Sequence, residues 1–143
     1  MPNTIEIELA SPSIAIISLI GEYDIAQCES LKAALARAAI RAPNVLVDLS
    51  HCALIDCAAL GLLLDSQNVV TRDGGRFGIA LPNEPNAVTR TAELVHLSER
   101  APTFASVPLA LASFQQDEFV AIRRHGPAAS WAGRTQPDAA PDA

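Results

Sequence analysis

Aromatic and basic residues are both scarce in this chain of 143 residues. Aromatic side chains make up 4% of it, and 10 Lys and Arg residues stand against 16 Asp and Glu residues, which gives a formal net charge of −6. Single-stranded nucleic acid is bound on aromatic faces where bases stack, and phosphate backbones need a basic surface. The composition therefore argues against nucleic acid as a partner.

Long apolar runs and paired cysteines are also missing. No run approaches the roughly 20 apolar residues of a membrane helix, and the N-terminus shows neither the basic segment nor the apolar core of a secretory signal. The three cysteines, Cys28, Cys52 and Cys57, contain no C-x-x-C pair. An odd number of unpaired thiols favours a reducing compartment over a disulfide framework. We therefore expect a cytoplasmic protein without direct membrane insertion.

The residues that are present predict one folded domain with a disordered end. Half of them are hydrophobic, enough to form a core. Apolar or alternating segments predict strands, and they alternate with helical patterns, as in an α/β protein with a mixed sheet of four to five strands and about four helices. The expected strands are Thr4–Leu9, Ile14–Ile20, Val45–Leu49, Arg76–Leu81 and Thr103–Ala105.

Two aspartates are expected to begin the first two helices. Asp24 is followed by Gln27 at the spacing of a capping box, and Ile25, Cys28, Leu31 and Leu35 then recur on one helical stripe. The other helices are expected after Asp56 (through Leu60, Leu63 and Leu64), from Asn83 or Pro85, and from Ser106 or Pro108 as far as Arg124. Residues 125–143, rich in Pro, Gly and Ala, predict a disordered tail after a domain of residues 1–124.

The central part of the chain carries a recognisable combination of motifs. Asp48-Leu49 ends a hydrophobic strand, the run from Asp56 to Gly61 (D-C-A-A-L-G) opens a helix, and Gly74-Gly75 precedes another strand. Upstream stands G-E-Y-D, residues 21–24. At these spacings the sequence resembles STAS domains, the family of anti-sigma factor antagonists, which read G-E-L-D upstream and D-S-S-G-L-G at the helix. The resemblance runs from about residue 4 to residue 115.

The resemblance implies a regulatory binding protein rather than an enzyme. Its partner would be an anti-sigma factor or a related kinase-fold regulator. In such domains the partner phosphorylates the serine that follows the acid, and the phosphorylated domain no longer binds the partner. The partner-binding residues would be Asp24, Asp56, Cys57, Ala58 and Gly61. The alternative is a STAS accessory subunit of a transporter or of a signalling assembly.

This chain departs from the family at the phosphoacceptor position. Cys57 stands where the family has its serine, and Ala58 follows, so neither offers a hydroxyl to a serine kinase. Cys57 is therefore not expected to be phosphorylated. Three readings remain open: a small residue that fills a tight site, a site that binds its partner constitutively, and a redox-sensing thiol. A helix N-terminus favours the thiolate, whereas the neighbouring charge of Asp56 disfavours it.

Catalytic, metal and cofactor motifs are not expected. The sequence has no Ser-His-Asp order, P-loop or dinucleotide fingerprint, and Asp24 and Asp56 read as helix caps rather than as a catalytic carboxylate pair. His51, Cys52 and Cys57 lie near one another without the ligand spacing of structural zinc. His96 is expected on a helix and His125 in the tail.

Overall fold

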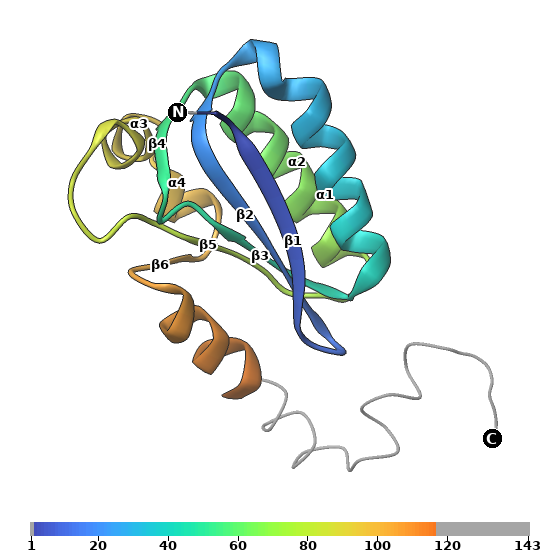
Figure 1. Ribbon diagram of the computed structural model, residues 1–143. Helices are drawn as coiled ribbons and strands as arrows, with labels where there is room; N and C mark the ends of the chain where they lie inside the picture. The colour runs from blue at the N-terminus through green and yellow to red at the C-terminus, as the bar shows by residue number, and fades with distance from the viewer. Residues whose placement is uncertain (1, 117–143) are drawn as a thin grey trace, which may run out of the picture. The chain divides into compact units, whose positions relative to one another are not determined.

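Strand β2, Ile14–Tyr23, organises the sheet (Figure 1). The computed structural model describes residues 2–116. Strand β1, Thr4–Ser11, pairs with β2 in antiparallel fashion, and β3, Asn44–Asp48, pairs in parallel with the first half of β2. Strands β5, Phe77–Ala80, and β6, Thr103–Phe104, extend the parallel part, in the order β1-β2-β3-β5-β6. The predicted α/β class with a mixed sheet is confirmed.

A further strand, β4, was not anticipated from the sequence. It spans Cys52–Ile55 and pairs in parallel with the last residues of β2, so the described sheet has six strands. Strand β3 pairs with the first half of β2, and β4 pairs with the end of the same strand. The register between β2 and β4 shifts between Gly21 and Glu22. Four residues are too few to show a clear alternation, so the sequence pattern does not mark this strand.

Helices α1, Cys28–Arg41, and α2, Cys57–Arg72, lie side by side along one face of the sheet (Figure 1). Helix α1 buries Leu31 and Leu35 as predicted, and α2 buries Leu60 and Leu63. Together with the strand residues that face them, they form the core, which includes Ile17, Leu19, Val45, Val47 and Ile79.

The predicted core stripe of the first helix was wrong at its beginning. Ile25 is 75% exposed, and Cys28 is half-buried. The reason is a separate 3₁₀ turn, η1, Ile25–Gln27, which precedes α1. A 3₁₀ turn has about three residues per turn, so Ile25 is out of phase with the buried stripe of the α-helix that follows.

The third helix begins later than Asn83 or Pro85. Helix α3, Ala87–Leu94, is capped by Asn86, whose Oδ1 accepts hydrogen bonds from the backbone N–H groups of Val88 and Thr89 at 2.8 and 3.2 Å. The prediction that His96 lies on a helix was also wrong. His96 has a left-handed φ of 54° and separates α3 from a short helix α4, Leu97–Arg100.

By its backbone contacts the chain divides after residue 110, so that residues 2–110 are described as one unit. Residues 107–116 are helical, and Ser106 Oγ accepts a hydrogen bond from the N–H of Leu109, in keeping with a helix that starts near Ser106. The expected end of this helix at Arg124 and the expected tail at residues 125–143 lie outside the described residues.

Candidate partner-binding site

Two parallel strands end side by side at the candidate site. The register pairs Tyr23 of β2 with Ile55 of β4, and the N–H of Asp56 donates to the carbonyl of Tyr23 at 3.0 Å. Each strand is followed at once by an aspartate and then by a helical turn. The sequence-predicted residues Asp24 and Asp56 are therefore brought together at one end of the sheet, although 32 positions separate them in the chain.

Asp24 caps the 3₁₀ turn η1. Its Oδ1 accepts from the N–H of Ala26 at 2.9 Å, and Gln27 Oε1 accepts from the N–H of Asp24 at 2.9 Å. The capping box expected from the sequence is thus present. These reciprocal bonds use backbone N–H groups that would otherwise lack partners, and they fix the shape of the loop after β2.

Asp56 caps α2 in the same way. Its Oδ1 accepts from the N–H of Ala59 at 2.9 Å, and its backbone is extended, as expected of an N-cap residue. A carboxylate also suits the positive end of the helix dipole. The interpretation of both aspartates as helix caps is confirmed, and both carboxylates are committed to backbone hydrogen bonds.

The residues after Asp56 lie on the surface. Cys57 and Ala58 are exposed, and Gly61 is half-buried. Cys57 therefore does not fill a tight site, so that reading of the cysteine was wrong. At Gly61 an added Cβ would meet no atom within 4 Å, which means that the folded domain itself leaves room for a side chain there.

Two buried titratable groups lie beneath this surface. Tyr23 is fully buried, and its hydroxyl donates to the carbonyl of Thr4 at 2.8 Å; burial raises the pKa of Tyr23 above its usual range. Burial likewise raises the pKa of the Cys52 thiol to about 11, against the effect of its hydrogen bond to the carbonyl of Leu54. Both groups are therefore protonated near neutral pH.

Asn86 connects a third helix to the same strand. While its Oδ1 caps α3, its Nδ2 donates to the carbonyl of Cys52 at 3.2 Å. Sequence reasoning missed this link, because nothing local marks a contact across 34 positions. The spacing of Asn86 and Thr89, which forms a capping box, was the signal that could have placed the start of α3 correctly.

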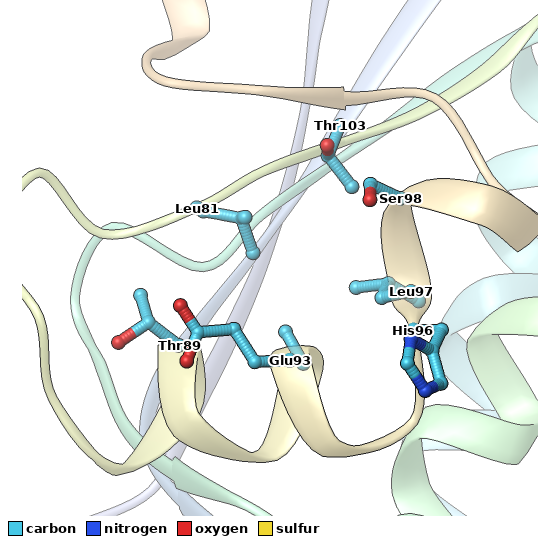
Figure 2. A pocket seen from close by; sticks show the side chains of 8 residues that line it. Leu81, Thr89, Glu93, His96, Leu97, Ser98 and Thr103 are labelled. Carbon is cyan, nitrogen blue, oxygen red and sulfur yellow. The ribbon is translucent and has the colours of Figure 1, made fainter.

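None of the predicted site residues lines the three described cavities, of about 210, 340 and 390 Å³. Figure 2 shows the cavity of about 340 Å³, which α3, α4 and the segments around Leu81 and Thr103 surround. Among residues 2–116, no three His, Cys, Asp or Glu side chains gather as a metal site would require. In the same range no helix is long and apolar enough to cross a membrane. The candidate site is a surface of helix starts and not an enclosed pocket.

Comparison with known families identifies the fold. Residues 9–107 match the family described as "Mlab, STAS domain". The chain belongs to the STAS domain family. The match covers both strands and both helix starts of the candidate site, so Asp24, Asp56 and Cys57 all lie inside the STAS domain. No curated protein matches the chain closely enough to count as a relative.

Solved structures share the fold of this STAS domain at low sequence identity. An anti-sigma factor antagonist from Mycobacterium paratuberculosis is 23% identical with a TM-score of 0.70, covering 80% of this chain and 95% of its own. The Bacillus anti-sigma factor antagonist SpoIIAA in its unphosphorylated form is 18% identical with a TM-score of 0.66, covering 79% and 97%. A sulfate transporter family protein from Wolinella succinogenes is 14% identical with a TM-score of 0.60, covering 76% and 90%.

Proposed function

We propose that this STAS domain is a cytoplasmic, anti-sigma factor antagonist-like protein that acts by binding and not by catalysis. Its partner is an anti-sigma factor or a related kinase-fold regulator, held at the surface formed by Asp24, Asp56, Cys57, Ala58 and Gly61. The observation that carries the proposal is the pairing of two aspartate-capped helix starts at the ends of β2 and β4. The fold similarity to two anti-sigma factor antagonists supports it.

Cys57 sets the regulation of this protein apart. SpoIIAA is known in a phosphorylated and an unphosphorylated form. In this chain the exposed residue after Asp56 is a thiol, and its exposed neighbour is Ala58. Neither carries a hydroxyl, so a serine kinase has no acceptor in this turn. We infer that the domain binds its partner without the phosphate-controlled release that a serine at this position would allow.

The Cys57→Ser variant tests this inference. Incubated with the partner kinase and ATP, the wild type should gain no phosphate in the turn of residues 56–61, because it offers no hydroxyl. The serine variant should gain one phosphate and then bind more weakly, since two negative charges are added to the contact surface. Intact-mass spectrometry and a binding titration measure the two effects.

The Cys57→Ala variant is the matched control, because it removes the thiol without adding a hydroxyl. It should remain unmodified, and its affinity should be the same before and after incubation with the kinase and ATP. Phosphate on the wild-type turn would refute the inference. A serine variant that stays unmodified beside a kinase proven active on another substrate would show that this turn is not a kinase target.

Two other functions, redox sensing and an accessory role in a larger assembly, are each supported by one observation. The exposure of Cys57 favours a redox-sensing thiol, which predicts rapid, selective reaction of Cys57 with a thiol reagent at neutral pH and a change in partner binding after oxidation. The fold shared with a sulfate transporter family protein favours an accessory role in a transporter or signalling assembly. Co-purification of a membrane transporter, instead of an anti-sigma factor, would favour that role.

A further inference from the structure

We propose that Ile25 is the apolar anchor through which this domain holds its partner, and that the partner offers an apolar pocket flanked by Lys or Arg side chains. The inference rests on the proposed function and names the chemistry of its binding surface. Ile25 is 75% exposed and lies directly after the capping residue Asp24. An isoleucine so exposed gains substantial free energy when a partner removes it from water.

The backbone around Ile25 is already fixed in the free domain. Asp24 Oδ1 accepts from the N–H of Ala26 at 2.9 Å, Gln27 Oε1 accepts from the N–H of Asp24 at 2.9 Å, and the N–H of Gln27 donates to the carbonyl of Asp24 at 3.1 Å. Ile25 is thus presented from a turn closed by three hydrogen bonds. A pre-organised anchor loses less conformational entropy on binding than one on a free loop.

Small and apolar side chains are exposed on the segments next to the anchor. Ala26 is exposed in the same turn, and η1 packs against α2, whose first residues Cys57 and Ala58 are also exposed. On the adjoining strand β4, Leu54 is 37% exposed. Short side chains next to a protruding isoleucine allow a partner surface to close around it, as in the desolvated centre of a binding hot spot.

The charged side chains nearest to Ile25 in the sequence are acids. Residues 1–31 and 42–71, which supply both strands and both helix starts of the site, contain no Lys or Arg. They contain eight acids, Glu6, Glu8, Glu22, Glu29, Asp24, Asp48, Asp56 and Asp65. Of these, Glu22, Asp24 and Glu29 are exposed close to Ile25 in sequence. An apolar centre with an acidic rim complements a pocket with a basic rim, and such pairing speeds association and makes it sensitive to salt.

Ile40 provides an internal control. It is 84% exposed near the end of α1, but Arg37 and Arg41 are its neighbours and no acid lies within five residues of it. Two isoleucines of similar exposure therefore stand in opposite electrostatic surroundings. The proposal assigns binding to Ile25 and none to Ile40.

The first step of the test identifies the partner. A photo-crosslinking phenylalanine analogue is placed at position 26, the exposed neighbour that leaves Ile25 in place, or at position 40 of the full chain, expressed in its native cells. Crosslinked proteins are identified by mass spectrometry. The proposal expects one protein to be crosslinked from position 26 and not from position 40. If no protein crosslinks preferentially from position 26, the proposal is overturned.

The second step uses that purified protein in binding titrations. Ile25→Ala should weaken binding by at least about 30-fold, the cost of losing a hot-spot side chain, whereas Ile40→Ala should change it by less than about 3-fold. Raising NaCl from about 50 to 300 mM should weaken binding of the wild type. Glu22→Gln with Glu29→Gln should reduce that salt dependence, whereas Glu84→Gln with Glu99→Gln, exposed acids elsewhere, should not. Equal losses for Ile25→Ala and Ile40→Ala would overturn the proposal.

The outcomes separate this inference from the proposed function. If the crosslinked protein is an anti-sigma factor but Ile25→Ala binds it like the wild type, the anchor is refuted and the proposed function stands. If the protein is of another class and its binding depends on Ile25 and on salt as described, the proposed function fails and the anchor stands. Unchanged melting temperatures of the variants exclude misfolding, which is not expected for exposed positions.

Discussion

Two glycines from the motifs of the site have opposite roles at the scale of single residues. Gly21 has a φ of 108°, and a Cβ placed there would collide with the side chain of Asn3. The same side chain accepts a hydrogen bond from the N–H of Glu22 at 2.8 Å. Gly61, in contrast, lies inside α2 with open space where its side chain would be. The fold requires a glycine at the first position and not at the second.

We therefore expect alanine to change stability in opposite directions at these positions. Gly21→Ala should lower the free energy of unfolding by about 1–3 kcal/mol, because a side chain is forced into a glycine conformation. Gly61→Ala should raise it by up to about 1 kcal/mol, the gain in helix propensity. Urea denaturation measures both. A loss at Gly61→Ala as large as that at Gly21→Ala would contradict this account.

The two cysteines near the site, Cys52 and Cys57, differ in burial. Cys52 is buried and its pKa is raised to about 11, from an ordinary value of 9.0, whereas Cys57 is exposed. Above about pH 9 the unfolded chain releases the Cys52 proton while the folded chain retains it. The unfolded state then binds fewer protons than the folded state, so stability should fall as the pH rises from 9 towards 11 and be fully present below 9.

Urea unfolding between pH 8 and 10 checks this dependence. Cys52→Ala should flatten the decline of the unfolding free energy, and Cys57→Ala should leave it as in the wild type. The range stays below pH 10 because Tyr23 also has a raised pKa and adds its own decline at higher pH. Identical slopes for the wild type and both variants would show that the Cys52 thiol does not control this dependence.

At the scale of elements, helix α2 contributes both to the exposed candidate site and to the core. Its first turn presents Cys57 and Ala58 at the surface, and its next turns bury Leu60 and Leu63 against the sheet. The buried side fixes the position of the exposed side, because a helix that is held in the core cannot rotate its first turn. Leu63 is fully buried, and its neighbour Leu64 is only partly buried against the core.

Truncation of these leucines tests the packing of α2. Leu63→Ala should lower the free energy of unfolding by about 2–5 kcal/mol, through lost burial and the cavity left behind. Leu64→Ala should cost less, because solvent already reaches its side chain. Urea denaturation at neutral pH compares them. If both variants stay within about 0.5 kcal/mol of the wild type, α2 does not pack these leucines in the core.

At the scale of the whole molecule, charge and composition vary along the chain. The segments that form the candidate site contain acids and no Lys or Arg, whereas Lys32, Arg37 and Arg41 lie on α1. Residues 125–143 hold one large apolar side chain, Trp131, and their expected independence from the domain is a hypothesis from composition. Ordering a residue costs about 1–2 kcal/mol, which such a segment cannot offset by burial.

Deleting residues 125–143 should therefore leave the melting temperature nearly unchanged. Calorimetry of the full chain and of residues 1–124 measures the difference. A drop of more than about 4 °C, which corresponds to roughly 1 kcal/mol for a domain of this size, would show that these residues pack on the domain.

The sequence by itself determined the class of the fold and most of its elements. Its apolar periodicities report burial directly, and Asp24 and Asp56 were recognisable as caps because a cap interacts with residues two or three positions away. The motif spacing also located Cys57 at the start of a helix. These features are local, so a single chain displays them without its fold.

Only the tertiary structure decided which local features meet. The pairing of β4 with β2 brings Asp24 and Asp56 to the same end of the sheet. The hydrogen bond from Asn86 to the carbonyl of Cys52 attaches helix α3 to β4. Both depend on contacts between residues more than 30 positions apart, which no local pattern encodes. The exposure of Ile25 was misread for a related reason: a 3₁₀ turn changes the phase of the helix, and the solvent-facing side is then set by packing against the sheet.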